Sequence, residues 1–431
     1  MKAQRLWRPY TQMKTADAPL EAVRTDGSRI HLEDGRVLID GIASWWTACH
    51  GYNHPHIREA VARQLETMPH VMFGGFTHQP AEQLAARLAG LLPGDLNHVF
   101  FTDSGSVAVE VAMKMAVQYW LNRGACGRTG FLAFREGYHG DTLGAMSVCD
   151  PDESMHAHFD GWLPKQRFAV LPRDEDSTGA LARTLAEHGE RIAAVIVEPL
   201  VQGAGGMRFH GPETLATIAR LARAHDVLLI ADEIFTGFGR TGSMFACEQA
   251  AVVPDIICLS KALTGGTMAL AATVATDAVF QAFWSDDPLK ALMHGPTFMA
   301  NPLACAAANA SLDLFEREPR VEQARAMEAR LLGGLTPCSA LPGVVDVRAK
   351  GAIGVVQLAG PPDREALKRA FVEQGVWVRP FGDVVYLAPA LNIADVDLER
   401  LCASMFSVLK DALKPASKGP TTVPATVKES V

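Results

Sequence analysis

The chain has 431 residues, 48% hydrophobic and 20% charged, so it is long enough for two domains or for one large core with a satellite unit. Its formal net charge of −8, without any basic block, argues against nucleic acid and anionic membranes as partners. The eight cysteines are scattered without a CxxC pair, and the longest apolar stretch is interrupted by Asp277, which together predict a cytoplasmic protein with reduced thiols and no membrane span.

Between residues 98 and 276 the chain alternates short apolar runs with longer helical patterns. Six of these runs are expected to be strands: 98–102, 130–134, 193–198, 227–232, 256–260 and 270–276. Most are continuously apolar, which is typical of strands buried on both faces of a parallel sheet. The alternation predicts an α/β fold with a mostly parallel central sheet.

The pattern changes in the last quarter of the chain, where a hairpin, a helix, further strands and a closing helix are expected. We therefore expect a large domain over 51–315 and a smaller α+β domain over 316–414. Residues 1–50, which contain a second hairpin pattern, are expected to join the smaller domain. Residues 415–431 are rich in Pro, Ser, Thr and Lys and are expected to be disordered.

Polar residues at the ends of these strands are informative because ligands of open α/β sheets bind beyond the carboxyl ends of the strands. In "FFTDSGSVAVEVAMKMA", Gly105 and Ser106 would open a helix whose free N–H groups suit a phosphate. An ordinary helix cap made by Asp103 or Ser104 is the alternative for this segment taken alone.

Two further strand ends carry ionisable groups. The strand "VLLIADE" ends in Asp232 and Glu233. A carboxylate at this place could pair with a cation, bind a metal, act as a base or cap the following turn. Lys261 follows the apolar strand "IICLS", where desolvation lowers the pKa of an amine and makes it nucleophilic towards aldehydes. A surface lysine at a helix start is the alternative.

Taken together, the three strand ends supply the parts that hold pyridoxal phosphate: a phosphate loop, an acid for the ring nitrogen and a lysine for the aldehyde. Tyr138, in "REGYHGDT", would offer an aromatic face to the cofactor ring. His139 and Asp141 share this loop, and each by itself reads as an ordinary polar loop residue. No metal site is expected.

The motifs "SGSVAVEVAMKMA", "GYHGDTLGAMS", "EPLVQGAGGM", "LLIADEIFTGFGRTG", "CLSKALTGG" and "HGPTFMANPLACAA" resemble those of the class III pyridoxal-phosphate aminotransferases of fold type I. The resemblance implies that Lys261 forms the Schiff base and moves protons, that Asp232 pairs with the pyridinium nitrogen and that Gly105–Ser106 hold the phosphate. It also implies a homodimer in which Pro296 and Thr297 reach the phosphate of the neighbouring subunit.

The sequence departs from relatives that use glutamate. Those enzymes carry a Glu and an Arg that switch between substrates, where this chain has Ala204 and Tyr386. Without the arginine, the α-carboxylate of glutamate lacks a bidentate partner.

The segments "LWRPYTQMK", "SWWTACHGYNHP" and "VWVRPFGDVVYLAP" resemble instead the members of the family that act in biotin synthesis. This resemblance implies S-adenosyl-L-methionine as amino donor and 8-amino-7-oxononanoate as acceptor. Arg379 would bind the distal carboxylate of the oxo acid, and Trp46 would pack in the core. The residues implied to line the substrate pocket are Tyr10, Trp45, Tyr138, Asp141, Lys261, Gly295, Arg379 and Tyr386.

Other functions stay open at this stage. The nearest is a class III enzyme that acts on an ω-amino acid or a diamine with pyruvate. A non-catalytic nucleotide-binding protein is more remote, because the chain has neither a GxGxxG fingerprint nor a Walker lysine. A purely structural protein would not explain three such groups at neighbouring strand ends.

Overall fold

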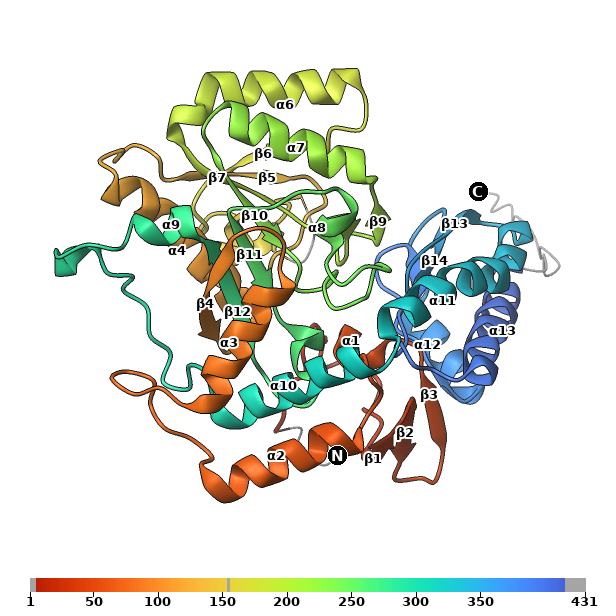
Figure 1. The fold of residues 1–431 in the computed structure, drawn as a ribbon. Helices are drawn as coiled ribbons and strands as arrows, with labels where there is room; N and C mark the ends of the chain where they lie inside the picture. The colour runs from red at the N-terminus through yellow and green to blue at the C-terminus, as the bar shows by residue number, and fades with distance from the viewer. Residues whose placement is uncertain (1–4, 153–155, 415–431) are drawn as a thin grey trace, which may run out of the picture.

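A computed structural model of the protein describes residues 5–152 and 156–414. Two units lie side by side, a larger one around a central sheet and a smaller one that contains most of the C-terminal quarter of the chain (Figure 1). The predicted disordered tail, residues 415–431, lies outside the described residues.

The larger unit is built on a seven-stranded sheet with the order β4-β12-β11-β10-β7-β5-β6. Its strands are β4 (Leu96–Thr102), β5 (Gly130–Phe134), β6 (Arg167–Ala169), β7 (Ile192–Val197), β10 (Leu228–Asp232), β11 (Ile256–Leu259) and β12 (Ala271–Thr276). β10 pairs in parallel with β7 and β11, and β5 pairs in parallel with β6 and β7, whereas β12 is antiparallel to β4 and β11. The predicted mostly parallel α/β sheet is confirmed. The three-residue edge strand β6 was not predicted, because it is too short to give a pattern.

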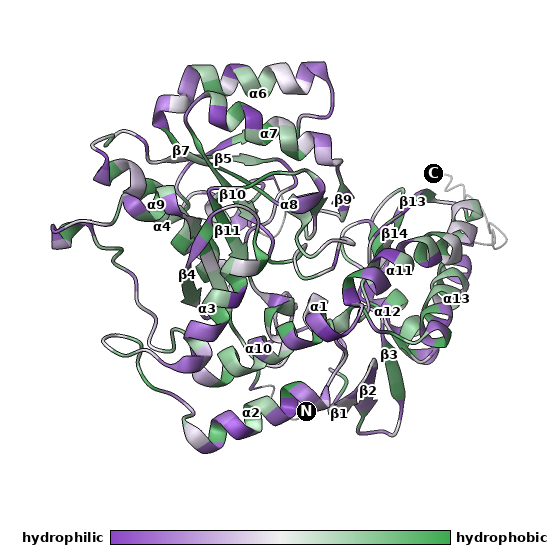
Figure 2. Cartoon of the chain, viewed as in Figure 1, coloured by the Kyte–Doolittle hydropathy of each residue, from purple (hydrophilic) through white to green (hydrophobic). Residues whose placement is uncertain are grey.

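Both faces of this sheet are buried. Within β11, Ile256 and Cys258 face one apolar cluster, and Ile257 and Leu259 face the other, as expected from the two-residue period of a strand. Helices therefore cover each face, and the strands carry apolar side chains while the outer helices carry polar ones as well (Figure 2). The helices of this unit are α2 (Pro55–Thr67), α3 (Gln79–Leu91), α4 (Gly105–Asn122), α5 (Leu143–Ser147), α6 (Glu175–His188), α7 (Pro212–Ala224), α8 (Ala246–Gln249), α9 (Asp277–Gln281) and α10 (Pro302–Arg317).

The smaller unit holds a three-stranded antiparallel sheet with the order β13-β14-β16. Its elements are β13 (Val344–Lys350), β14 (Ile353–Leu358), β16 (Val384–Leu387), α11 (Arg320–Leu335), α12 (Arg364–Glu373) and α13 (Asp395–Ala412). The predicted hairpin over β13 and β14 and the predicted closing helix are thus present.

A second sheet joins the two ends of the chain. It contains β1 (Ala22–Asp26), β2 (Arg29–Leu32), β3 (Val37–Asp40) and β15 (Val376–Trp377). β3 and β15 pair in parallel, which places the N-terminal segment against the C-terminal part of the chain. This pairing supports the proposed association of residues 1–50 with the smaller domain; the boundaries at 50, 315 and 414 stay a proposal.

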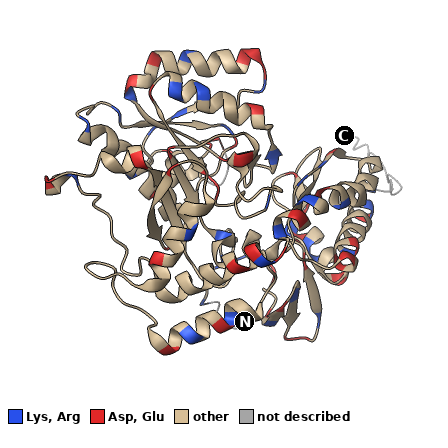
Figure 3. Cartoon of the chain, viewed as in Figure 1, with Lys and Arg blue, Asp and Glu red and all other residues tan. Residues whose placement is uncertain are grey.

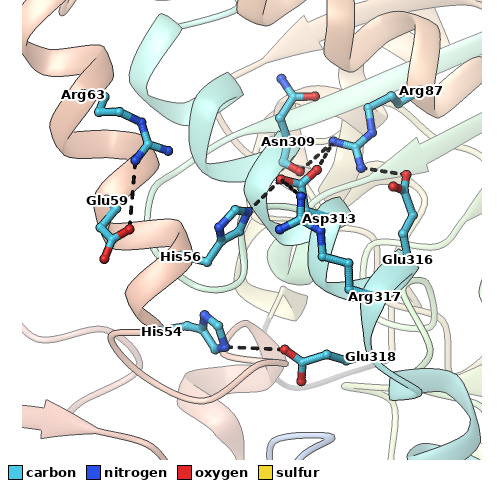
Figure 4. Close-up of polar contacts among 10 residues, drawn as sticks. All are labelled: His54, His56, Glu59, Arg63, Arg87, Asn309, Asp313, Glu316, Arg317 and Glu318. Atoms are coloured by element: carbon cyan, nitrogen blue, oxygen red, sulfur yellow. Dashed lines mark hydrogen bonds and ion pairs between the residues drawn. The ribbon is translucent and has the colours of Figure 1, made fainter.

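Polar contacts link α2, α3 and α10 on the outside of the larger unit (Figure 4). Asp313 of α10 accepts hydrogen bonds from His56 of α2 at 2.7 Å and from Arg87 of α3 at 2.9 Å. Arg87 also contacts Glu316 at 2.7 Å. One carboxylate therefore connects three helices.

Charged residues of both signs are mixed along the outer helices, including α6, α7 and α13 (Figure 3). Among the helices of residues 5–152 and 156–414, none is long and apolar enough to cross a membrane. All eight cysteines have free thiols, and only Cys126 is exposed.

Candidate active site

Most of the predicted site residues gather at one edge of the central sheet. Because β4, β5, β7, β10 and β11 all run in the same direction, their carboxyl ends lie along this edge. Asp232 is the last residue of β10 and lies beside Cys258 of β11, three residues before Lys261. The loop that carries Tyr138 follows β5, and Gly105 opens α4 just after β4.

Lys261 opens the 3₁₀ helix η3 (Lys261–Thr264) with a φ of 48°, in the left-handed region that non-glycine residues rarely adopt. Its Nζ lies 4.7 Å from the centroid of the Trp46 ring. Burial lowers the pKa of the amine, and the carboxylates of Asp232, Glu198 and Asp141 only partly oppose this effect. The neutral, nucleophilic form of the amine is thus favoured compared with a lysine in water.

Asp232 is paired with a histidine that the sequence did not single out as functional. His139 Nδ1 lies 2.8 Å from Asp232 Oδ2, and both side chains are buried. Burial lowers the pKa of His139, but the hydrogen bond and charge of Asp232, with the charge of Glu198, outweigh burial and leave that pKa raised. Oδ1 of Asp232 accepts a hydrogen bond from the Ile234 amide at 3.1 Å. The carboxylate is therefore held on both oxygens.

Glu233, the neighbouring acid, faces away from this chemistry. Its carboxylate accepts the amides of Ala246 and Cys247, each at 2.7 Å, at the start of α8. Burial raises its pKa to about 7. The structure thus gives Glu233 a role as a helix cap, one of the options that the strand end alone left open for both acids.

The start of α4 is capped by a side chain, and it also lies beside the loop that carries Tyr138. The Ser104 side chain caps the helix by accepting from the Val107 amide at 3.4 Å. Ser106 Oγ accepts from the Asp141 amide at 3.1 Å. Gly140 packs against this serine so closely that a Cβ there would lie 2.3 Å from Ser106 Oγ. The loop after β5 is therefore fastened to the predicted phosphate loop.

Tyr10, Tyr138 and Asp141, from distant parts of the sequence, meet above the edge. Asp141 accepts from the Tyr138 hydroxyl at 2.9 Å and from the Tyr10 hydroxyl at 2.5 Å. Burial raises the pKa of Tyr10 to about 12, with a further contribution from the hydrogen bond to Asp141, and burial also raises the pKa of Tyr138. His156, another unpredicted neighbour, stacks parallel to the Tyr138 ring at 5.8 Å.

Trp45 and Arg379 form the opposite side of the cluster. The guanidinium carbon of Arg379 lies 4.6 Å from the centroid of the Trp45 ring, and the Tyr10 ring meets Trp45 edge-on at 6.2 Å. Tyr386 is only 1% exposed and packs against Phe381 and Trp46. Tyr386 therefore supports Trp46 from behind more than it offers an open surface.

The structure does not bring Gly295, Pro296 and Thr297 to the other site residues. They lie in the connection between α9 and α10, where Gly295 and Thr297 are exposed. Within the described parts of the chain, no hydrogen bond joins these three residues to Lys261 or Asp232. The predicted role of Pro296 and Thr297 from a neighbouring subunit, and that of Gly295 in the substrate pocket, stay proposals.

Sequence reasoning missed the supporting residues His139 and Glu198. Glu198 follows β7, and its buried carboxylate accepts the Tyr138 amide at 3.0 Å and the Gly203 amide at 2.9 Å. Burial raises its pKa to about 7. His139 directly follows Tyr138 in the sequence, and this adjacency indicated that His139 lies near the site. The pairing with Asp232, however, depends on how the loop folds back over the sheet.

Comparison with known proteins identifies the class of protein. The family model "Aminotransferase class-III" matches residues 10–409, and the chain belongs to this family of pyridoxal-phosphate-dependent transferases. This confirms the predicted fold type and enzyme class.

Particular relatives narrow the comparison. The adenosylmethionine-8-amino-7-oxononanoate aminotransferase of Corynebacterium glutamicum is 45% identical over 94% of this chain and 96% of its own length. The enzyme of the same name from Mycobacterium leprae is 46% identical over 94% and 95%. The crystal structure of such an aminotransferase from Methanocaldococcus jannaschii superposes with a TM-score of 0.91 at 34% identity, covering 95% of this chain and 97% of that one.

An amine transaminase from an uncultivated Pseudomonas species, solved in its PLP-bound form, is also similar. Its TM-score is 0.87 at 32% identity, over 95% of this chain and 99% of that one. The fold alone therefore does not separate the two kinds of transaminase.

The residues at the sheet edge fit pyridoxal phosphate chemically. Lys261 supplies an amine with a lowered pKa, which has no hydrogen-bonding partner among the described residues. Asp232 supplies a buried carboxylate, and the start of α4 supplies backbone N–H groups. These are the three kinds of group that the aldehyde, the ring nitrogen and the phosphate of the cofactor need.

Proposed function

We propose that the protein transfers the amino group of S-adenosyl-L-methionine to 8-amino-7-oxononanoate and so makes 7,8-diaminononanoate for biotin synthesis. The observation that carries the proposal is the Arg379–Trp45 pair beside Tyr10. Arg379 is half-buried, forms no ion pair with an acidic side chain of the described residues and lies over the Trp45 ring, an arrangement that suits an alkyl chain ending in a carboxylate. The extensive identity to the two bacterial relatives of that name supports it.

The bound pyridoxal phosphate would withdraw electrons from the substrate Cα and so acidify its proton. The chain's own residues would do the rest. Lys261 Nζ, whose pKa is lowered by burial, would take the proton from the substrate Cα and return it. Asp232, fixed by His139, would hold the cofactor ring nitrogen protonated. Ser106 and the start of α4 would hold the phosphate.

The substrate would be oriented by the two sides of the pocket. Arg379 would bind the distal carboxylate with its fork of N–H groups. Tyr138 and Tyr10, both linked to Asp141, would close the pocket on the side of the amino donor. Trp45 would exclude water from the alkyl chain.

A second candidate, an ω-amino acid or amine transaminase that uses pyruvate, is favoured by the likeness to solved omega-transaminases, one of them from Thermomicrobium roseum at 32% identity. The donors distinguish the two candidates. The proposed enzyme should accept S-adenosyl-L-methionine and reject β-alanine and diamines.

A half-reaction measured by absorbance tests the proposal. The purified, cofactor-loaded protein is mixed with S-adenosyl-L-methionine, and the absorbance of the cofactor aldehyde is expected to disappear; 8-amino-7-oxononanoate should then restore it. A protein whose spectrum responds to β-alanine and pyruvate, but to neither proposed substrate, would contradict the proposal and favour the second candidate.

We also propose that the protein is a homodimer in which Gly295, Pro296 and Thr297 of one chain complete the site of the other. Large apolar side chains are exposed in two neighbouring loops: Met72, Phe76, Met293 and Phe298. The loops touch, since the rings of His70 and Phe298 are 4.5 Å apart. Exposed apolar patches of this kind mark interfaces between subunits.

A further inference from the structure

The segment that carries Trp45 has an unusual backbone. Four consecutive residues, Ala43 to Trp46, have φ values of 45°, 48°, 56° and 72°. L-residues adopt this left-handed conformation as single residues and rarely in series, because the Cβ approaches the following carbonyl oxygen. None of the four is a glycine. Such a turn persists only when its surroundings hold it in place.

A buried carboxylate holds this turn. Asp40, 1% exposed, accepts the Ile42 amide on Oδ1 at 2.9 Å, and the Ser44 amide on Oδ2 at 2.7 Å. The Tyr52 hydroxyl donates to the same Oδ2 at 2.6 Å and lies 2.6 Å from Ser44 Oγ. Asp40 thus binds the residue before the turn and the second residue of the turn, and Tyr52 binds both Asp40 and Ser44.

The same aspartate lies where the turn and Arg379 originate. Asp40 is the last residue of β3 and pairs with Trp377, the last residue of β15. The Trp377 carbonyl accepts the Gly41 amide at 2.9 Å. Beyond this pair the two segments of the chain diverge, and they meet again where Arg379 lies over the Trp45 ring. The geometry of the Trp45–Arg379 contact therefore depends on the conformation of the turn.

The turn also reaches the lysine. Trp46 packs on Phe235 with ring centroids 4.1 Å apart, and Lys261 Nζ lies 4.7 Å from the centroid of the Trp46 ring. The left-handed turn makes it possible for adjacent tryptophans to serve different sides, with Trp45 at the arginine and Trp46 at the amine.

From these contacts we infer that Asp40 and Tyr52 are positioning residues for the acceptor substrate. They lock the left-handed turn of residues 43–46 and thereby fix Trp45 against Arg379 at the place where the distal carboxylate of the oxo acid binds. The inference rests on the proposed function, because it concerns the acceptor end of that site.

Tyr52→Phe tests the inference, with Tyr119→Phe as the matched control. Both changes remove one hydroxyl from a partly or fully buried tyrosine, but Tyr119 lies in α4 and bonds Arg123, away from the turn. Tyr52→Phe is expected to raise the KM for 8-amino-7-oxononanoate about ten-fold, as the loss of a hydrogen bond to a charged group would. The KM for the donor and the rate of the donor half-reaction should change less. Near-UV circular dichroism of the tryptophans should also change. Tyr119→Phe should leave both KM values and the rate of the donor half-reaction unchanged. Because the Tyr119 ring meets Trp120 edge-on at 4.8 Å, the near-UV spectrum is compared only between Tyr52→Phe and the unaltered protein.

Asp40→Asn provides a second measurement. The NH₂ group of asparagine would face one of the two backbone N–H groups that now donate to Asp40. Because two donors cannot bond each other, the turn should loosen further than in Tyr52→Phe. The KM for the acceptor is expected to rise beyond that of Tyr52→Phe, with the tryptophan spectrum altered in the same sense.

The outcomes separate the inference from the proposed function. If the unaltered protein does not react with the proposed substrates, the proposed function fails, and the tryptophan spectra of Tyr52→Phe still report on the turn. If the unaltered protein is active and Tyr52→Phe keeps its acceptor KM and its tryptophan spectrum, the inference is overturned. If the KM for the acceptor rises equally in Tyr52→Phe and Tyr119→Phe, Tyr52 contributes only to general stability, and the inference is likewise overturned.

Discussion

At the scale of single residues, the site depends on ionisable groups that are kept from water. Lys261, Asp232 and His139 lie where an isolated charge is costly. Asp232 and His139 offset this cost by their direct contact at 2.8 Å. Lys261 has no such partner among the described residues, and burial lowers its pKa. Removal of one member of a buried pair leaves the other uncompensated, so each side chain is sensitive to the loss of its neighbour.

His139→Asn should therefore be severe. Asp232 would lose its charged partner inside the protein, and we expect the free energy of unfolding to fall by about 3 kcal/mol. The catalytic rate should fall as well, because Asp232 would no longer be held in place. Chemical unfolding and steady-state kinetics measure the two effects. His98 and Asp277 form a similar pair at 2.8 Å on the surface, so His98→Asn should change neither quantity appreciably.

His50 provides a prediction about pH. Burial, with the charges of Arg320 and His54, lowers its pKa to about 3 from an ordinary value of 6.5. The unfolded chain takes up a proton below about pH 6.5 that the folded chain refuses until about pH 3. The contribution of His50 to stability must therefore fall as the pH decreases from 6.5. Between pH 6.5 and 5 this residue should account for about 2 kcal/mol of the loss.

Urea unfolding of His50→Gln and of the unaltered protein at pH 7.5, 6.5 and 5 measures this contribution. The variant should be less stable at high pH but should lose less stability on acidification. Parallel pH profiles of the two proteins would contradict the assignment.

At the scale of elements, the larger unit is joined by polar contacts as well as by its core. Asp313 of α10 binds His56 of α2 and Arg87 of α3, so a single side chain fixes the relative positions of three helices (Figure 4). Burial raises the pKa of Asp313, but the hydrogen bonds of His56 and Arg87 leave it lowered. The contribution of Asp313 to stability is thus fully present above the pKa that it has in the unfolded chain, and it is lost as the pH falls through its lower pKa in the folded chain.

Asp313→Asn should reduce the free energy of unfolding by about 1 to 2 kcal/mol at pH 7, since two hydrogen bonds to a charged acceptor are weakened. The pair of Glu59 and Arg63 on α2 spans 4.0 Å and is exposed. Glu59→Gln is therefore the control and should have little effect. Thermal unfolding of the three proteins decides this, and equal Tm values for Asp313→Asn and the unaltered chain would contradict it.

At the scale of the whole molecule, the proposed dimer implies that a second chain completes the site. The loop with Gly295, Pro296 and Thr297 lies along the outside of the larger unit, between α9 and α10 (Figure 1). In the proposed dimer, the second chain docks on the exposed apolar side chains beside this loop. Activity should therefore depend on assembly.

Sedimentation should give twice the chain mass of 46.4 kDa for the unaltered protein. Phe298→Glu places a charge in the proposed interface and should shift the protein towards the monomer, with loss of activity in proportion. Val345→Glu changes an equally exposed apolar residue of β13 and should leave mass and activity unchanged. A fully active monomer of Phe298→Glu would refute the dimer proposal.

Across these scales, local signals in the sequence determined much of the molecule. Continuous apolar runs bounded by turns predicted the strands of the parallel sheet, because burial on both faces leaves no polar alternation. Asp232, Lys261 and Gly105 were found by their positions at strand ends. The chemistry of the cofactor followed from which residue types stand there.

Tertiary structure alone decided which side chains are partners. The pairing of His139 with Asp232, the meeting of Tyr10 with Asp141, and the left-handed turn held by Asp40 join residues far apart in sequence or depend on backbone angles. No local pattern encodes them, because such contacts form only when the packing of the sheet, the loops and the two chain ends fixes their distances. Residue types and periodicity thus specify the layers and the reactive groups, and long-range packing specifies the geometry in which those groups act.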